Sequence, residues 1–138
     1  MSRVRLTRAI EFSTSLRYWN PDWSEERNRA RFGPRARRHG HNYRLEVTLA
    51  GEPDPTTGMV MDLKDLQDLL EREVMARFDH RDLNRDTPWF EKEPPTPENL
   101  ARVIHRLLAD ALPEGLLHHI RLYEDPDTFV EIAAEASP

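Results

Sequence analysis

The sequence predicts an α+β domain in which two helices cover one face of an antiparallel sheet, with the element order β-β-α-α-β-β. Two patterns predict this fold class. Both ends of the chain alternate apolar and polar residues at the period of a β-strand, and the segments between them repeat apolar residues at the period of a helix. A chain of 138 residues is expected to bury one hydrophobic core, so residues 1–138 are assigned to a single domain.

Two long strands are expected in the N-terminal part of the domain. Residues 3–16 place apolar side chains on one face, which Arg8 and Thr14 interrupt. Residues 39–50 alternate more regularly, and their apolar face carries His39, His41, Tyr43, Leu45, Val47 and Leu49. Residues 17–38 lie between the two strands, contain two prolines and are rich in arginine, so we expect an irregular insertion there.

Two helices are expected in the middle of the chain. Asp62 can cap the first helix, along which apolar residues repeat at helical spacing, namely Leu63, Leu66, Leu70, Val74 and Phe78. The run Thr96-Pro97-Glu98 gives the second helix a cap, a proline at its first position and an acid in its first turn. The inward face of this helix carries Leu100, Val103, Ile104, Leu107 and Ala111. Two short strands over residues 117–124 and 128–133 then complete the sheet.

Composition excludes several classes of function. A net charge of -5 with 33% charged residues is ordinary for a soluble protein, and it does not indicate a partner that is nucleic acid. The absence of cysteine excludes disulfides, thiolate metal ligands and a cysteine nucleophile. The sequence shows neither an apolar signal core nor a run of membrane-spanning length, so we expect a cytoplasmic protein with no membrane partner.

The run His39-Gly40-His41 is the most informative motif. Alternation places both imidazoles on the same face, at one end of a strand, where neutral ring nitrogens can share one zinc ion. The alternative is that the pair only hydrogen-bonds to backbone at the end of the strand.

Three further positions carry polar groups suited to binding a partner or to proton transfer. Glu124 alternates with Ile120 and Leu122, so its carboxylate points toward the buried face and needs a partner, which one of the many arginines could supply. Asp79-His80 follows the first helix and pairs a carboxylate with an imidazole, an arrangement suited to proton transfer; the alternative is an exposed polar loop.

The chain resembles the 6-pyruvoyl-tetrahydropterin synthase family, which includes the 6-carboxytetrahydropterin synthases of queuosine biosynthesis. The matching segments occur in the order of the family and cover nearly the whole chain. They are Phe12-Ser13, Phe32-Gly33, His39-Gly40-His41-Asn42-Tyr43, Gly58-Met59-Val60-Met61-Asp62-Leu63, Asp79-His80-Arg81-Asp82-Leu83-Asn84, Pro95-Thr96-Pro97-Glu98-Asn99 and Glu124.

The resemblance implies a fold, an assembly and a reaction. The family has the tunnelling fold, whose subunits close their sheets into a barrel as trimers that stack in pairs, so we expect a homo-trimer or homo-hexamer with active sites between subunits. It implies a carbon–oxygen lyase that acts on dihydroneopterin triphosphate with zinc as cofactor. In the family pattern Asp79 and His80 form a proton relay, Glu124 binds the pterin, and Thr96 lines the pterin pocket.

Two positions depart from the family pattern. Leu16 stands where the family has its third zinc-binding histidine, and Arg35 is nearest to the position of the catalytic cysteine. Arginine remains protonated and offers only donors, so it cannot act as the base. The histidine pair can still hold zinc if water or another residue completes the coordination, at lower affinity.

Three interpretations therefore remain. In the first, the protein is a synthase of altered or reduced activity that uses His80 as base and the arginine-rich insertion to hold a phosphorylated pterin. In the second, it is a pterin-binding paralogue without the lyase step. In the third, which is the weakest, the arginines of residues 27–38 bind RNA or another anionic polymer, although Glu25 and Glu26 dilute that charge.

Overall fold

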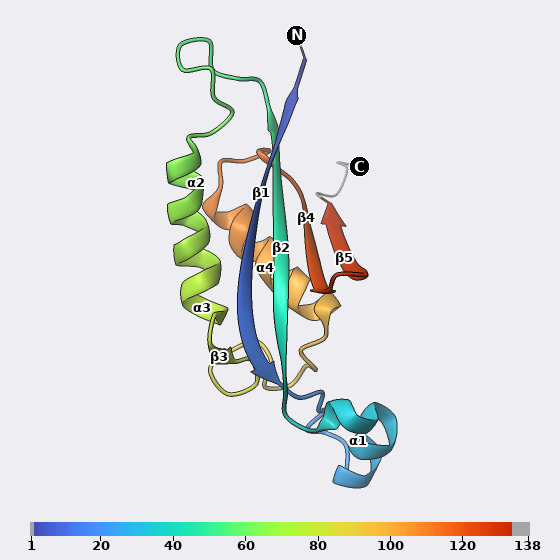
Figure 1. Cartoon of the computed structure of the whole chain (residues 1–138). Coiled ribbons are helices and arrows are strands. Elements are labelled where there is room, and N and C mark those ends of the chain that lie inside the picture. Colours follow the sequence, from blue (N-terminus) through green and yellow to red (C-terminus); the bar gives the residue numbers. More distant parts are fainter. Residues whose placement is uncertain (1, 134–138) are drawn as a thin grey trace.

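A single five-stranded sheet forms the centre of the molecule (Figure 1). The computed structural model describes residues 2–133. Along the sheet the strands lie in the order β3-β1-β2-β4-β5, and all neighbours are antiparallel except β3, which is parallel to β1. The strands are β1 Val4–Leu16, β2 His39–Gly51, β3 Arg81–Asp82, β4 Leu117–Asp125 and β5 Thr128–Ala133. Strand β3 was not predicted, because two residues are too short to show alternation.

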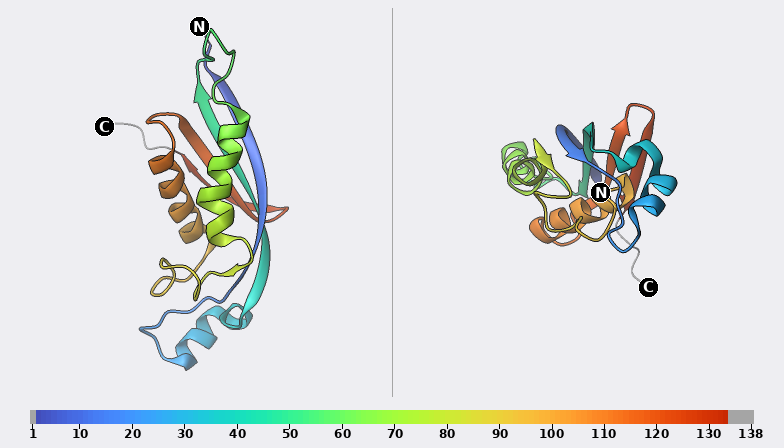
Figure 2. Two further views of the ribbon diagram at one scale, coloured as in Figure 1. Left: turned by 90° about the vertical axis from the view of Figure 1, so that its left-hand side faces the viewer. Right: turned by 90° about the horizontal axis from the view of Figure 1, so that it is seen from below.

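Two helical segments cover the same face of this sheet (Figure 2). The first is a continuous run of α2 (Leu63–Leu70), a π-helical turn η2 (Glu71–Met75) and α3 (Ala76–Phe78), and the second is α4 (Pro97–Ala111). The predicted α+β class with two helices on one face is therefore confirmed. None of the helices in residues 2–133 combines the length and the apolar character needed to span a bilayer.

The pairing of β1 with β2 is the longest in the sheet. It runs without interruption from Val4 opposite Gly51 to Leu16 opposite His39. In the second half of β1 the side chains of Phe12, Thr14 and Leu16 are buried, and Phe12 stacks on Tyr43 with ring centroids 5.2 Å apart. The first half of β1 extends past the helices, where Val4 is 43% exposed. The expected apolar face of β1 is therefore buried only in the second half of the strand.

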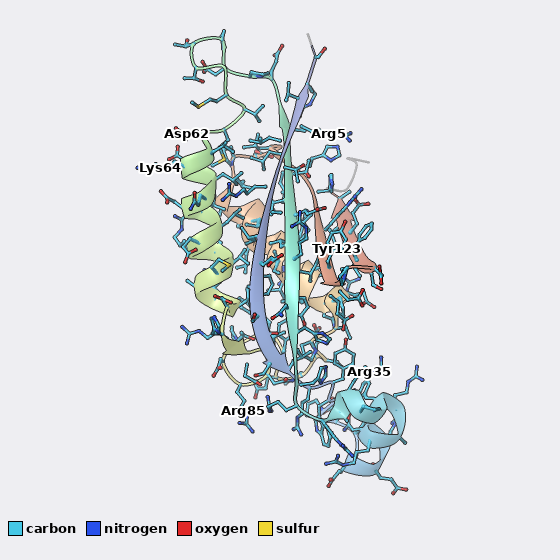
Figure 3. The ribbon with its side chains drawn as sticks, in the orientation of Figure 1. Arg5, Arg35, Asp62, Lys64, Arg85 and Tyr123 are labelled. Carbon is cyan, nitrogen blue, oxygen red and sulfur yellow. The ribbon has the colours of Figure 1, made fainter. Side chains whose placement is uncertain are left out.

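Both predicted helix caps are present. Asp62 Oδ1 accepts a hydrogen bond of 2.9 Å from the amide of Lys64, and Figure 3 shows both residues at the start of α2. Thr96 Oγ1 accepts a hydrogen bond of 3.2 Å from the amide of Asn99 at the start of α4. Leu63, the first apolar residue of the helical repeat seen in the sequence, is 52% exposed, because the buried face of α2 begins at Leu66.

The insertion between β1 and β2 is ordered rather than irregular, which corrects the expectation for residues 17–38. It contains helix α1 (Glu25–Phe32) and a 3₁₀ turn, η1 (Gly33–Ala36). Asn28 is fully buried and binds the loop before the helix: its Nδ2 donates to the carbonyl of Asn20 at 2.9 Å, and its Oδ1 accepts from the amide of Asn20 at 2.7 Å. Composition alone suggested a loop, because the helix has no apolar stripe.

The burial contrast within α2 gives a stability prediction. Leu66→Ala should lower the free energy of unfolding by about 2–5 kcal/mol, because it leaves a cavity in the core. Leu63→Ala, the matched control one turn earlier, should change it by less than about 0.5 kcal/mol. Urea unfolding followed by circular dichroism measures both. Equal losses of unfolding free energy in the two variants would mean that the buried face of α2 is assigned wrongly.

His105 on α4 gives a prediction on pH. Its Nε2 is buried with no hydrogen-bond partner among residues 2–133, and burial lowers the pKa of His105 from its usual 6.5. The unfolded chain therefore takes up this proton first, and stability should fall as the pH falls through about 6.5. In thermal melts between pH 8 and pH 5, the melting temperature of His105→Gln should depend less on pH than that of the wild type. The control Arg106→Gln should show the same change of melting temperature with pH as the wild type.

Candidate functional site

The two histidines of the His39-Gly40-His41 motif lie at the end of β2 that meets the insertion. Their ring centroids are 5.1 Å apart, and both side chains are on the sheet face that the helices cover, as predicted. Directly across the β1–β2 ladder, Leu16 is the partner of His39 and Thr14 is the partner of His41. Leu16 is fully buried and offers no donor atom at this position.

His39 is held in one orientation by the backbone. Its Nδ1 lies 2.7 Å from the carbonyl oxygen of Arg37, and because a carbonyl can only accept, Nδ1 carries the proton. The Nε2 atom then carries a free lone pair, and it is buried without a hydrogen-bond partner in residues 2–133. Metal-binding histidines commonly show this arrangement, with one nitrogen bonded to backbone and the other available.

His41 contacts Glu124. The His41 Nε2 and Glu124 Oε1 atoms are 3.1 Å apart, and each side chain is about one-quarter exposed. The sequence indicated that the Glu124 carboxylate needs a partner, and within residues 2–133 that partner is a histidine rather than an arginine. Burial lowers the pKa of His41, and the charge of Glu124 opposes this shift without cancelling it.

Tyr18 is a member of this group that the sequence analysis missed. It is 5% exposed, its ring centroid is 6.0 Å from that of His39, and the Arg35 guanidinium lies 5.4 Å from its ring. Burial and the charge of Glu124 raise the pKa of Tyr18 to about 12. The signal that could have revealed it is alternation, because Tyr18 continues the face of Phe12, Thr14 and Leu16 past the predicted end of the strand.

Asp79 and His80 lie beside β1 instead. Asp79 Oδ1 accepts a hydrogen bond of 3.0 Å from the amide of Ser13, and the amide of His80 donates to the carbonyl of Ser13 at 2.7 Å. The His80 side chain is 84% exposed, and its Nε2 is 3.6 Å from Asp79 Oδ2. His80 has a φ of 58°, the only positive φ among the non-glycine residues described, so this loop holds a strained conformation.

The structure therefore gathers only part of the predicted site. His39, His41 and Glu124 lie together, but Asp79 and His80 are next to β3, on the other side of β1 and β2. From β3 to β4 there are three strand spacings of about 4.8 Å each. Figure 3 shows the two sides, with Arg35 and Arg85 on opposite sides of the lower ends of β1 and β2.

Thr96 caps α4, and within residues 2–133 its hydroxyl makes no hydrogen bond to the histidine group. Glu98 in the first turn of that helix is close enough for its charge to raise the pKa of Tyr18. Figure 1 shows that α4 begins beside the turn between β4 and β5, at the end of β4 that carries Glu124.

The donor set accounts for only half of a tetrahedral zinc site. His39 and His41 supply two imidazoles, Leu16 supplies nothing, and no group of three or more His, Asp or Glu side chains within residues 2–133 could hold a metal ion. The buried free Nε2 of His39 is the feature that suits a metal.

Comparison with known proteins identifies the family. Residues 5–135 match the family model described as 6-pyruvoyl tetrahydropterin synthase. The chain belongs to this family. The family membership inferred from the sequence motifs is therefore confirmed.

Curated relatives are similar over almost their whole length. The 6-pyruvoyl tetrahydrobiopterin synthase of Pongo abelii is 39% identical and that of Homo sapiens is 38% identical, each over 135 residues that cover 96% of this chain and 93% of that protein. The 6-carboxy-5,6,7,8-tetrahydropterin synthase of Rickettsia conorii is 27% identical over 147 residues, covering 94% of this chain and 99% of that protein.

Solved structures share the fold. The structure of Caenorhabditis elegans 6-pyruvoyl tetrahydropterin synthase aligns with a TM-score of 0.91 at 31% identity and covers 98% of each chain. The structure of the Plasmodium falciparum 6-pyruvoyl tetrahydropterin synthase aligns with a TM-score of 0.71 at 14% identity, covering 99% of this chain and all of that one, which supports the fold alone.

Proposed function

We propose that this protein binds a reduced pterin, dihydroneopterin triphosphate or a close relative, and acts as a carbon–oxygen lyase of the 6-pyruvoyl- or 6-carboxytetrahydropterin synthase type with reduced or altered activity. The observation that carries the proposal is the Glu124 carboxylate, which lies on the buried face of the sheet 3.1 Å from His41 and is still one-quarter exposed. Membership of the family supplies the chemical class of the ligand.

Glu124 is suited to the edge of a pterin. The heterocycle presents a guanidine-like pair of N–H donors, and a carboxylate can accept both at once. A partly buried carboxylate strengthens such a pair, because little water competes for it. In the free protein His41 occupies one carboxylate oxygen, so pterin binding would replace or share that contact. Thr96, at the start of α4, would line the same pocket.

The proton relay is proposed to come from a neighbouring subunit. Within one chain, β1 and β2 separate Asp79 and His80 from Glu124, so a single subunit does not assemble the full set. A homo-trimer or homo-hexamer in which sheets join edge to edge would bring the β3 side of one subunit to the β4 side of the next. In that arrangement Asp79 orients His80, which is free to exchange a proton because its side chain is 84% exposed.

Zinc is proposed as a cofactor held by His39 and His41. A bound zinc ion would polarise the side-chain oxygens of the substrate. Water or a residue of another subunit would have to complete the coordination where Leu16 stands, so affinity should be lower than for a three-histidine site.

A non-catalytic pterin-binding protein is the second candidate. It is favoured by the fully buried Leu16 opposite His39 and by the absence of any cysteine in the chain. Both candidates place the pterin at Glu124 and in the cytoplasm, and they differ only in whether turnover follows.

The pterin assignment is tested at Glu124. Glu124→Ala should weaken binding of neopterin by about 2–4 kcal/mol, because a partly buried charge-assisted pair is lost. Quenching of pterin fluorescence measures the affinity. The control Glu46→Ala removes a carboxylate from the opposite face of the sheet and should bind as wild type does. Unchanged binding by Glu124→Ala would contradict the pterin assignment.

The zinc proposal is tested by metal content. After extensive dialysis, the wild-type protein should keep less than one zinc per chain, and His39→Ala should reduce the content to background, because one of only two donors is lost. Mass spectrometry of the metal measures both. A content that His39→Ala leaves unchanged would place the metal elsewhere, and one full equivalent in the wild type would show that a further residue completes the site.

The lyase proposal is tested by turnover of dihydroneopterin triphosphate, with products identified by mass. Loss of the positioned base should slow the reaction by about 10²–10⁴-fold relative to the family. His80→Ala should abolish the remaining activity, whereas the double change Leu16→His with Arg35→Cys should raise it. Ordinary turnover that is insensitive to His80→Ala would mean that another group is the base, and no turnover in any variant would favour the binding protein.

A further inference from the structure

The ring of Tyr18 lies beside His39 and is held in place by its neighbours. It meets the edge of the Phe32 ring with centroids 5.9 Å apart and an interplanar angle of 89°, and its centroid is 6.0 Å from that of His39. The guanidinium carbon of Arg35 is 5.4 Å from the Tyr18 ring centroid. The Tyr18 amide also donates a hydrogen bond of 2.8 Å to the carbonyl of Arg35, which fixes the backbone. These contacts fix the direction in which the Tyr18 hydroxyl points.

The hydroxyl of Tyr18 has no partner in the part of the chain that the structure describes. No hydrogen bond joins it to another side chain or to the backbone of residues 2–133. The side chain is only 5% exposed, and the hydroxyl oxygen belongs to that exposed part, unlike the closed-off Nε2 of His39. A hydroxyl in this position has lost most of its water without gaining a protein partner, so an oxygen of a bound ligand would satisfy it.

Tyr18 and Glu124 face the same space. The charge of Glu124 raises the pKa of Tyr18, so the carboxylate lies near enough for its field to reach the hydroxyl. Glu124 Oε1 is 3.1 Å from His41 Nε2, and the ring centroids of His41 and His39 are 5.1 Å apart. A row of polar side chains therefore leads from Glu124 through the two histidines to Tyr18. The carboxylate at one end of this row is an acceptor, and the hydroxyl at the other end is a donor.

We propose that Tyr18 is a specificity-determining residue, whose hydroxyl donates a hydrogen bond to an oxygen on the side chain of the bound pterin. The inference rests on the proposed function, which places the N–H edge of the pterin at Glu124. The side chain leaves the bicyclic ring at the end remote from that edge, so a pterin that lies along the row directs its side-chain oxygens toward Tyr18. A ligand without such an oxygen is disfavoured, because the donor then stays unpaired.

Two pterins that differ only in the side chain test the role of Tyr18. Neopterin carries hydroxyl groups on its side chain, and 6-methylpterin carries none. Tyr18→Phe keeps the ring and removes only the oxygen, so it should weaken neopterin binding by about 3- to 10-fold, as expected for one neutral hydrogen bond, and leave 6-methylpterin binding unchanged. Quenching of pterin fluorescence measures all four affinities. Equal affinity of wild type and Tyr18→Phe for neopterin would overturn the proposal and assign the side-chain oxygens to other groups.

Tyr123→Phe is the matched control. It makes the same change on the other face of the sheet, where Tyr123 is the cross-strand partner of Arg44 and packs on Phe129 with ring centroids 4.9 Å apart. Figure 3 shows Tyr123 on β4, away from the insertion that carries Arg35. This variant should bind both pterins as the wild type does.

Thermal melts separate a ligand contact from a structural role. Because the Tyr18 hydroxyl has no protein partner, Tyr18→Phe should melt within about 2 °C of the wild type. A clearly lower melting temperature, together with an equal loss of affinity for neopterin and for 6-methylpterin, would make the hydroxyl structural and overturn the proposal.

Glu124→Ala distinguishes a failure of this inference from a failure of the proposed function. It should weaken neopterin and 6-methylpterin alike, because both present the same N–H edge. If Glu124→Ala has this effect and Tyr18→Phe does not discriminate between the two pterins, the role of Tyr18 is refuted and the pterin site is kept. If the wild type binds neither pterin, the proposed function is refuted and this inference falls with it.

Discussion

The unbroken antiparallel pairing of β1 and β2 is the constraint on which the rest of the structure depends. Because the ladder keeps one register from Val4 to Leu16, it decides which residue faces which at the functional end, and it places Leu16 across from His39. A shift of one residue would turn every side chain of one strand to the other face. The stack of Phe12 on Tyr43 within the core resists such a shift.

Most of the fold could be predicted because its strongest signals are periodic. The alternation of residues 39–50 and the helical spacing of residues 62–78 each mark an apolar face, and the two faces pack against each other in the core. The short strand β3 and helix α1 could not be predicted in this way. The first contains two residues, and the second is fixed by the buried amide of Asn28 rather than by an apolar stripe.

The candidate site could be predicted only in part, for a similar reason. Alternation indicated that His39, His41 and Glu124 share a face, but only the pairing of β2 with β4 brings Glu124 next to His41. The position of His80 depends on hydrogen bonds to the backbone of Ser13, which leave no pattern in the sequence.

The π-helical turn between α2 and α3 determines how the chain leaves this helical run. A π turn accommodates one more residue than an α turn, and each residue of an α-helix corresponds to a rotation of about 100° about the axis. The extra residue within Glu71–Met75 therefore sets the direction in which Phe78 and Asp79 emerge. If one residue of this segment were deleted, α2 could keep its buried face, but Phe78 would rotate away from Phe12 and Asp79 away from the amide of Ser13. The length of this single turn thus sets the orientation of the loop that carries His80.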